Sequence, residues 1–480
     1  MKREDADLTD ETLEIPPVDI AEDVEDLEDL ALRDDYALNP AYVEMVIDAA
    51  DRGDSARLAV LIGALHPADV ADLMGFLTAD YREQVIPVLD PQALAEIISE
   101  LEDNLREEVL VAVPSATLAK ALGELDSDDA ADVVDDLDKR KRAQVLAAMP
   151  QADRAAIETA LAFEDETAGR LMQREVLAAP AFWTVGQTID HVRASSDDLP
   201  ELFFDIYVVD PAYHPVGAVP VSALLRADRD TALLAIMEAV IEITVDQDQE
   251  EVAYIFDKYH LISAPVVDDS GRLVGQITVD DIVGVIAEET EEDILALAGV
   301  SDAGRDASIW DIARSRLPWL MVNTVTAALA ASVIQAFHAQ IEKLVVLAVL
   351  MPVVASLGGN AGTQTLAVAV RALASRELNA ANALRIVLRE MSVGVMNGLA
   401  LAALLAAAVY IWFRDPMLCL TLALALLINL FVASLAGILV PLALDRLGRD
   451  PAVSSSVFVT FVTDFVGFLS FLGLAALILL

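Results

Sequence analysis

The sequence predicts a multidomain protein with three parts: an α-helical superhelix, a pair of α/β modules, and an all-α transmembrane bundle of five helices. The first observation is that 55% of the 480 residues are apolar and the mean hydropathy is +0.49, which is too apolar for a wholly soluble chain. The second is that this apolar character is concentrated after Pro318. The third is that two internal repeats, one helical and one α/β, precede Pro318.

Charge is divided between the two halves as unevenly as hydropathy. Residues 318–480 contain 8 basic and 7 acidic residues, whereas residues 1–317 contain 23 basic and 71 acidic residues, a net charge of −48. A region this acidic does not bind nucleic acid or an anionic membrane surface by charge, but it attracts cations. Solubility in a salty cytoplasm is the alternative explanation. Cys419 is the only cysteine, which excludes disulfides within the chain and thiolate zinc sites.

The N-terminal half begins with an acidic stretch and continues with a helical repeat. Residues 1–38 are poor in large apolar side chains and lack a secretory signal, so we expect a disordered leader and a cytoplasmic N-terminal half. Residues 39–164 contain units such as LHPADVADLMGFL (65–77) and LDPQALAEIISEL (89–101), in which a cap or proline precedes apolar residues at helical spacing. This repeat predicts a superhelix of short stacked helices.

Residues 165–290 contain the α/β repeat. The stretch VVDPAYHPVGAVPVSALL (208–225) matches VVDDSGRLVGQITVDDIV (266–283) at an offset of 58 residues. Each copy has the pattern of a strand, a tight turn, a second strand and a helix, and a further helical piece precedes it. The pattern predicts two modules that pack on one another.

The remainder of the chain is predicted to reach and cross a membrane. Residues 291–317 are expected to form a connecting helix that brings Arg314 and Arg316 to the lipid headgroups. Within the pore domain, 318–480, five segments each have the roughly 20 apolar residues that span a bilayer. They are 319–338, 344–370, 384–412, 417–442 and 453–480.

Loop charges predict the orientation of these spans. With a cytoplasmic N-terminus, 6 of the 8 basic residues of this half fall in inner loops, as the positive-inside rule requires. We therefore expect a multi-pass protein in contact with the lipid of a bacterial inner membrane, with its C-terminus outside.

Asp464 is the only acidic residue of the last span. An ionisable group at mid-bilayer costs at least ~2.5–3.5 kcal/mol, so such residues are normally hidden from lipid and functional. Ser456 and Thr460 share its helix face at four-residue spacing. We expect these three residues to line a pore; the alternative is a carboxyl that bonds to a neighbouring helix or lies nearer the interface.

The second span contains a polar, glycine-rich segment, GGNAGTQT, in which Gly359, Asn360 and Thr363 are candidate pore-lining residues. The segment is expected to be easily unwound, and unwound backbone at this depth is tolerated only where it is buried in protein or lines a wet cavity. The alternative is that the small residues serve close helix packing. Asn397 and Asn429 are further candidates that equally suit bonding between helices.

One carboxylate among amides and hydroxyls suits a hard cation that keeps its water. Mg²⁺ gives up water reluctantly and is usually held by one or two carboxylates plus retained waters, whereas Ca²⁺ needs a denser oxygen cage. The chain has no Gly-Lys dipeptide for a Walker A loop, no HExxH motif, and no paired carboxylates in the membrane half. We therefore expect a transporter that is not an enzyme.

Several motifs resemble the MgtE family of magnesium channels and transporters over nearly the whole chain after the leader. They are LHPADVADL, EDETAGRLM (164–172), the modules ending in GRLVGQITVDDIV, PVVASLGGNAGTQ, and DPAVSSSVFVTFVTDFVGFLSFLGLA (450–475). The last two are the most specific. The paired modules are similar to the cystathionine-β-synthase (CBS) repeats of many regulated channels.

The resemblance implies Mg²⁺ uptake by a homodimer whose five helices per subunit enclose one pore, with Asp464 as the central ion site. It also implies that cytoplasmic Mg²⁺ bridges acidic faces of the helical domain, the CBS pair and the connecting helix and closes the pore. ATP is implied as an adenine-nucleotide modulator of the CBS pair, with Thr278 and Asp281 as candidate ribose contacts. The positions that match the sensor acids are Asp128, Asp132, Asp248, Glu250, Asp281, Glu289, Glu292 and Asp293.

Three positions depart from the family pattern. Val457 stands where a helix-kinking proline is usual, and His260 and Gly284 stand where further acids are usual, which predicts fewer or weaker sensor sites.

Electrostatics predicts a cation-dependent switch without any resemblance. Two carboxylates about 4 Å apart repel by ~4 kcal/mol at an effective dielectric of 20, and divalent ions reverse this repulsion. We expect the pore to open when cytoplasmic Mg²⁺ is scarce. The alternative function is a CBS-regulated transporter of another divalent metal (Co²⁺, Ni²⁺ or Mn²⁺) or of a small cation, gated by adenine nucleotide.

Overall fold

The computed structural model describes residue 27 and residues 30–480, except for 102, 195–198, 200–201, 299, 301–308, 379–381 and 453–454. The chain divides into two compact units, residues 1–283 and 284–480, and each is described by itself. Most of the predicted leader lies outside the described residues. Its last part, from Leu30, belongs to the helical domain, because Ala31 and Leu38 are buried in the core of that domain.

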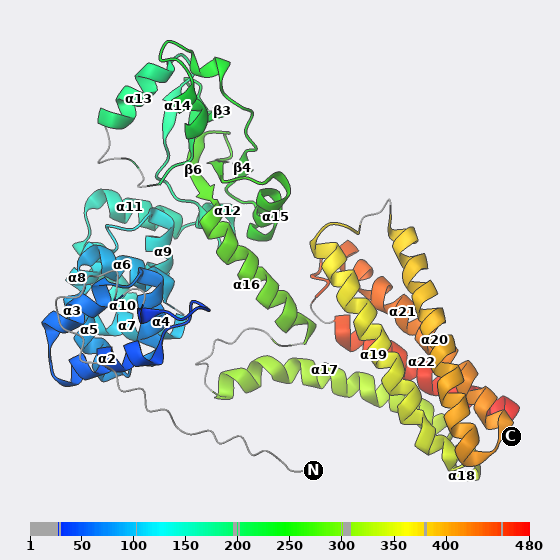
Figure 1. Cartoon of the computed structure of the whole chain (residues 1–480). Helices are drawn as coiled ribbons and strands as arrows, with labels where there is room; N and C mark the ends of the chain where they lie inside the picture. Colours follow the sequence, from blue (N-terminus) through cyan, green and yellow to red (C-terminus); the bar gives the residue numbers. More distant parts are fainter. Residues whose placement is uncertain are drawn as a thin grey trace, which may run out of the picture. The chain divides into compact units, whose positions relative to one another are not determined.

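Short helices form the first part of the N-terminal unit, coloured blue to cyan in Figure 1. Local signals begin them: the Asp90 carboxylate accepts a hydrogen bond from the Ala93 amide at 2.9 Å, and Pro67 and Pro91 occupy the first turns of their helices. One continuous apolar core joins them. The helices are α2 (Pro40–Asp51), α3 (Ser55–Gly63), α4 (Pro67–Phe76), α5 (Ala79–Val85), η1 (Ile86–Val88), α6 (Pro91–Glu100), α7 (Asp103–Ala112), α8 (Ser115–Ala121), α9 (Ser127–Asp135), α10 (Lys139–Ala148) and α11 (Gln151–Ala160).

After the short helix α12 (Ala168–Leu171), the predicted α/β pair consists of two three-stranded sheets of identical topology. In each sheet the first strand is parallel to the second and the second is antiparallel to the third. The register shifts between Val208 and Val209 in one sheet and between Val266 and Val267 in the other, at the same point of the 58-residue repeat. The strands are β1 (Ala178–Pro180), β2 (Asp205–Val209), β3 (Pro215–Pro220), β4 (Ile243–Thr244), β5 (Ser263–Val267) and β6 (Leu273–Thr278).

The modules are joined by exchanged backbone segments and by a buried polar chain. Gln173 pairs with Gln276 of β6, and Glu238 pairs with Ala218 of β3. The Tyr207 hydroxyl donates to the Ser263 hydroxyl at 2.8 Å. The Ser263 hydroxyl in turn donates to Asp205 Oδ2 of β2, also at 2.8 Å. The helical elements of this part are α13 (Val185–Ala194), α14 (Val221–Arg226), η3 (Leu233–Ala235), α15 (Gln249–Tyr259) and α16 (Val279–Leu297).

Five helices of the second unit are long and apolar enough to cross a membrane, as the sequence predicts. The described residues form α17 (Ile309–Ala336), the short α18 (His338–Lys343), α19 (Val346–Ala374), α20 (Ala383–Phe413), α21 (Pro416–Arg446) and α22 (Ser455–Ile478). Figure 1 shows α19, α20, α21 and α22 side by side, and an apolar core joins them.

Two expectations about helix continuity differ from the structure. The glycine-rich segment of the second span is not unwound, because α19 is one continuous helix from Val346 to Ala374. The first membrane helix begins at Ile309, so Pro318 lies inside it rather than before it. The expected connecting helix over 291–317 includes residues outside the described part of the chain and stays a prediction.

A glycine pair tests the packing of the α/β modules. A Cβ at Gly275 would lie 2.6 Å from the Gln173 carbonyl oxygen, whereas a Cβ at Gly284 in α16 would meet nothing within 4 Å. We expect Gly275→Ala to destabilise the protein by ~1–3 kcal/mol through overpacking, and Gly284→Ala to be neutral or to stabilise it by up to ~1 kcal/mol. Chemical denaturation of the two purified variants measures this, and equal midpoints would contradict it.

Candidate functional site

The last membrane helix, α22, places Asp464 beside its packed face. Every fourth residue of α22 is buried against the other helices, including Val459, Thr463 and Gly467. The next stripe around the helix, which contains Ser456, Thr460 and Asp464, is only half-buried. The three residues that the sequence predicts as pore-lining therefore share one partly open stripe.

A second polar surface lies on α19. One side of this helix exposes Ser356, Asn360, Thr363 and Gln364, although the helix is long and apolar enough to cross a membrane. The opposite side carries buried Val354, Gly358, Gly362 and Thr365, which face neighbouring helices. The predicted pore-lining residues of α19 thus lie on its open side.

At Gly359, α19 lies close to the segment of α22 that carries Asp464. The atom nearest to a Cβ at this position is the Thr463 hydroxyl, 4.0 Å away, and Thr463 directly precedes Asp464. Carboxylate, amide and hydroxyl groups therefore lie on neighbouring segments of α22 and α19, although Thr463 itself is buried. Oxygen ligands of this kind suit a hard cation. In the described part of the chain, Asp464 forms no salt bridge that would neutralise it.

The sequence left open whether the glycines of α19 serve close helix packing or line a wet cavity, and the structure separates them. A Cβ at Gly358 would lie 2.1 Å from the Asn429 amide nitrogen, and one at Gly362 would lie 2.6 Å from a Val459 methyl carbon. These two glycines serve close helix packing. Gly359 has no such contact and belongs to the open surface.

Five aspartates meet where the helical domain contacts the α/β pair. Asp126, Asp128 and Asp129 are at the start of α9, and Asp280 and Asp281 are at the start of α16. We call these five residues the acidic cluster. Asp128 is only 9% exposed, and its Oδ1 has no hydrogen-bond partner among the described residues.

Burial and like charges raise the pKa values of three members of the acidic cluster, Asp128, Asp129 and Asp281. Burial, then Asp281 and Asp129, hold the pKa of Asp128 well above its ordinary value. Burial and the nearby Asp281 raise the pKa of Asp129 to about 7, and burial raises the pKa of Asp281 to about 6. The cluster therefore favours any process that removes its negative charge, either proton uptake or cation binding.

Hydrogen bonds hold α9 against the modules despite this repulsion. The Ser127 hydroxyl donates to Glu175 Oε2 at 2.8 Å and accepts from the Arg174 amide at 2.9 Å. On the other side of the cluster, the Thr278 hydroxyl donates to Asp281 Oδ2 at 2.7 Å. Thr278 and Asp281 thus bond to one another at the start of α16, and their contact with a nucleotide ribose stays a prediction.

The other predicted sensor acids are spread over three places. Asp132 accepts a hydrogen bond from Arg106 at 2.7 Å and is paired with that cation. Asp248 and Glu250 are exposed at the start of α15, beside the segment that joins the helical domain to the modules. Glu289, Glu292 and Asp293 lie on the second half of α16.

Sequence reasoning missed several acids near the predicted ones. Asp126, Asp129 and Asp280 adjoin predicted ligands in the runs LDSDDAAD and TVDD, which was the available signal. No sequence signal pointed to Asp450, which precedes α22. It lies near Asp293, because burial, then Asp450 and then Glu292 raise the pKa of Asp293. Among the described residues, no group of three or more Asp, Glu, His or Cys side chains is already arranged around a metal position.

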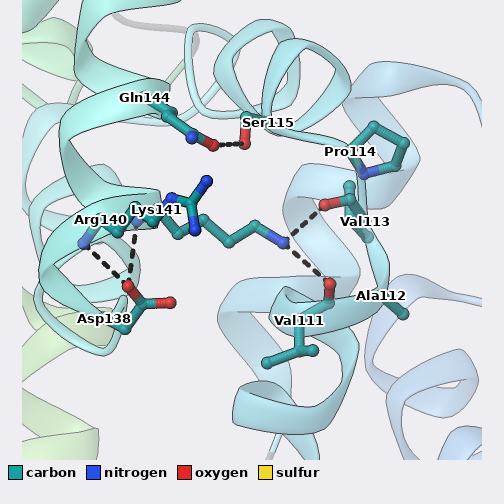
Figure 2. A pocket seen from close by; sticks show the side chains of 9 residues that line it. All are labelled: Val111, Ala112, Val113, Pro114, Ser115, Asp138, Arg140, Lys141 and Gln144. Carbon is teal, nitrogen blue, oxygen red and sulfur yellow. Dashed lines mark hydrogen bonds between the residues drawn. The ribbon is translucent and has the colours of Figure 1, made fainter.

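A cavity of about 380 Å³ in the helical domain lies between α7 and α10, where Lys141 reaches the carbonyl end of α7 (Figure 2). The Lys141 ammonium donates to the carbonyl oxygens of Val111 at 3.0 Å and Val113 at 2.7 Å, and also to that of Leu110. It thereby caps the carbonyl end of α7. The cavity contains none of the predicted functional residues.

The fold and the candidate sites together indicate a class: a multi-pass membrane protein with an acidic N-terminal part and polar side chains on two helices of its bundle. Family models match at three places: a divalent cation transporter model at residues 351–474, an MgtE intracellular N domain at 65–166, and a CBS domain at 235–288. The chain belongs to the MgtE family.

Individual relatives show the extent of the match. The chain is 34% identical to the magnesium transporter MgtE of Thermus thermophilus over 443 residues, which cover 90% of this chain and 97% of that one. It is 35% identical to the magnesium transporter MgtE of Enterococcus faecalis over 67% of this chain and 71% of that one. A crystal structure of the cytosolic domain of the Mg²⁺ channel MgtE in complex with ATP is 32% identical, covers 51% of this chain and 99% of that one, and has a TM-score of 0.49.

The raised pKa values predict how pH affects metal-free protein. An aspartate with a raised pKa in the folded state stabilises that state when protonated, and the stabilisation is lost as the pH rises through about 6 for Asp281 and about 7 for Asp129. We expect Asp129→Asn combined with Asp281→Asn to raise the denaturation midpoint more at about pH 8 than at about pH 5.5. Denaturation in chelator, with Asp72→Asn as an exposed control, measures this. A gain that is larger at the lower pH would contradict it.

Proposed function

We propose that the chain is a channel or transporter for Mg²⁺ that mediates Mg²⁺ uptake across a bacterial inner membrane. The observation that carries the proposal is the half-buried Asp464 on a polar stripe of α22, beside a segment of α19 that exposes amide and hydroxyl groups. A carboxylate that faced hydrocarbon there would cost at least ~2.5–3.5 kcal/mol. Water and a visiting cation along this surface remove that cost.

We infer that a second copy of the chain covers these polar side chains. Polar groups at membrane depth are tolerated when they are covered by protein or line a water-filled route. Among the described residues of one subunit, the polar side of α19 is exposed and the polar stripe of α22 is only half-buried. A homodimer that encloses one path between two such surfaces satisfies both requirements and places two Asp464 carboxylates around it.

The ligand set favours Mg²⁺ over ions that need more direct ligands. One carboxylate per chain, with hydroxyls of Thr460 and Ser456 on the same stripe, suits an ion that keeps several waters. The names of the relatives agree with this choice. Competition by Co²⁺, Ni²⁺ and Mn²⁺ in the transport assay distinguishes the alternative substrates.

Replacing Asp464 tests the permeation site. We expect Asp464→Ala to lower Mg²⁺ flux into proteoliposomes at least about tenfold, because a loss of ~1.4 kcal/mol in ion stabilisation corresponds to that factor. Glu342→Gln, an exposed acid outside the candidate spans, is the control and should transport normally. Magnesium flux that is unaffected by Asp464→Ala would remove the site assignment.

We further propose that cytoplasmic Mg²⁺ closes the path by neutralising the acidic cluster and the acids of α16. The buried, unpaired Oδ1 of Asp128 and the mutual repulsion of the aspartates support this. Because no described acids are prearranged around a metal position, the ion draws them together or binds through water. Cation binding would then favour the closely packed arrangement of the domains.

The C-terminal half of α16 offers a route from the sensor to the path. Ala296 packs in an apolar cluster with Leu366 and Val370 of α19 and Val459 of α22. Val459 in turn occupies the space that Gly362 leaves open. A change in the charge of α16 therefore acts on helices that carry the polar surfaces.

Neutralising α16 tests this proposal. We expect the combination Glu289→Gln, Glu292→Gln and Asp293→Asn to lower the Mg²⁺ concentration needed to bring the domains together, because repulsion is removed, and to weaken Mg²⁺-dependent closure. Protease protection and flux, each measured against Mg²⁺ concentration, report the two effects. The exposed acids Glu44, Asp72 and Glu83, neutralised together, are the control. Unchanged protection in the α16 variant would count against the proposal.

A further inference from the structure

Asn429 of α21 is a fully buried amide in the middle of the membrane bundle. Its nitrogen donates to the Val354 carbonyl oxygen of α19 at 2.9 Å, and its Oδ1 has no hydrogen-bond partner in the part of the chain that the structure describes. An unpaired buried polar atom costs ~1–3 kcal/mol, so an apolar side chain of similar size would fill this place more favourably if only packing mattered. The amide therefore calls for an explanation beyond packing.

Two glycines on different helices leave the space that Asn429 fills. A Cβ at Gly358 of α19 would lie 2.1 Å from the Asn429 amide nitrogen, and one at Gly467 of α22 would lie 2.8 Å from it. The side chain of α21 thus lies between α19 and α22 and touches the backbone of both. Neither position has room for even a methyl group while Asn429 remains in place.

A second close contact joins the same three helices, one turn further along α19 and about two turns away along α21 and α22. A Cβ at Gly362 would lie 2.6 Å from a Val459 methyl carbon, and one at Gly437 would lie 2.7 Å from the Gly362 carbonyl oxygen. Asp464 falls between these two layers in the sequence of α22, after Val459 and before Gly467. The position of its carboxylate relative to the polar side of α19 is therefore fixed by the layer at Gly362 and by the layer at Asn429.

We propose that Asn429 is a positioning residue of the ion path. By bonding to the Val354 carbonyl and filling the space at Gly358 and Gly467, it sets the separation and rotation of α19 and α22. It thereby sets the distance between Asp464 and the oxygen groups of α19 that a hydrated cation contacts. Asn429 itself lies behind the path and does not touch the ion.

The inference rests on the proposed function, because a positioning residue needs a path to position. A purely structural amide would change stability and the amount of folded protein alone. A positioning residue also changes how well the path distinguishes ions, since an error of ~1 Å in a binding constellation is enough to impair it. The ratio of Mg²⁺ to Co²⁺ initial rates therefore separates the two roles.

The test measures Mg²⁺ and Co²⁺ flux into proteoliposomes with the full-length protein, and thermal unfolding of each variant in detergent. Gly358→Ala should lower Mg²⁺ flux at least about tenfold, and adding Asn429→Ala should restore it to within about threefold of the Asn429→Ala value, since contacting residues couple strongly. Asn429→Leu should fold while its Mg²⁺ to Co²⁺ ratio shifts at least about threefold. Gly473→Ala, also in α22 with its nearest atom 4.0 Å away, is the control that should transport normally.

Three results would overturn the inference: normal flux in Gly358→Ala, no recovery in a folded Gly358→Ala/Asn429→Ala protein, or an unchanged ion ratio in folded Asn429→Leu. Asp464→Ala, measured in the same series, separates this failure from that of the proposed function. If Asp464→Ala abolishes flux while the Asn429 and Gly358 variants behave like wild type, the inference alone fails. If Asp464→Ala transports normally, the proposed function fails and the inference fails with it.

Discussion

The cost of placing one carboxylate at membrane depth constrains the rest of the bundle. Asp464 is half-buried and forms no salt bridge in the described part of the chain, so its charge has to be balanced by water, by a cation, or by both. A segment of α19 with exposed amide and hydroxyl groups packs beside this part of α22, and glycines on α19, α21 and α22 allow these helices to pack closely. The charge, the polar side chains and the glycine contacts therefore lie in the same part of the bundle.

The cost of unbalanced negative charge also shapes the N-terminal half. There the carboxylates are crowded rather than isolated, and burial and repulsion raise the pKa values of Asp128, Asp129 and Asp281. Hydrogen bonds at Ser127 hold the crowded surfaces together at close range. A region with a net charge of −48 can therefore respond steeply to divalent cations, because small changes in ion occupancy alter a large repulsive energy.

Local signals in the sequence predicted most of the fold. Caps and prolines such as Asp90 and Pro67 begin helices where expected, the 58-residue repeat gives two sheets with the same irregularity, and hydropathy gives the five candidate spans. Contacts between distant parts were harder to predict. That Asp128 and Asp281 approach one another, or that Arg106 pairs with Asp132, depends on how separate helices pack.

The glycine-rich segment of α19 shows why the candidate site was predicted only in part. A run of glycines in a membrane span is consistent with an unwound backbone or with close packing, and the choice depends on the neighbouring helix. Here Asn429 and Val459 supply large side chains opposite Gly358 and Gly362, so the helix stays intact and two of the glycines become contact points. The composition of the segment alone does not contain this information.

The central claim is that a hydrated divalent cation visits Asp464 on a path between two copies of the chain. The most direct measurement is the anomalous scattering of Mn²⁺, used in place of Mg²⁺, in crystals of the full-length protein. The account predicts a peak on the axis between two subunits, at a distance from both Asp464 carboxylates that leaves room for intervening water. An Asp464 side chain that faces lipid, with no peak and no continuous aqueous route beside it, would contradict the account.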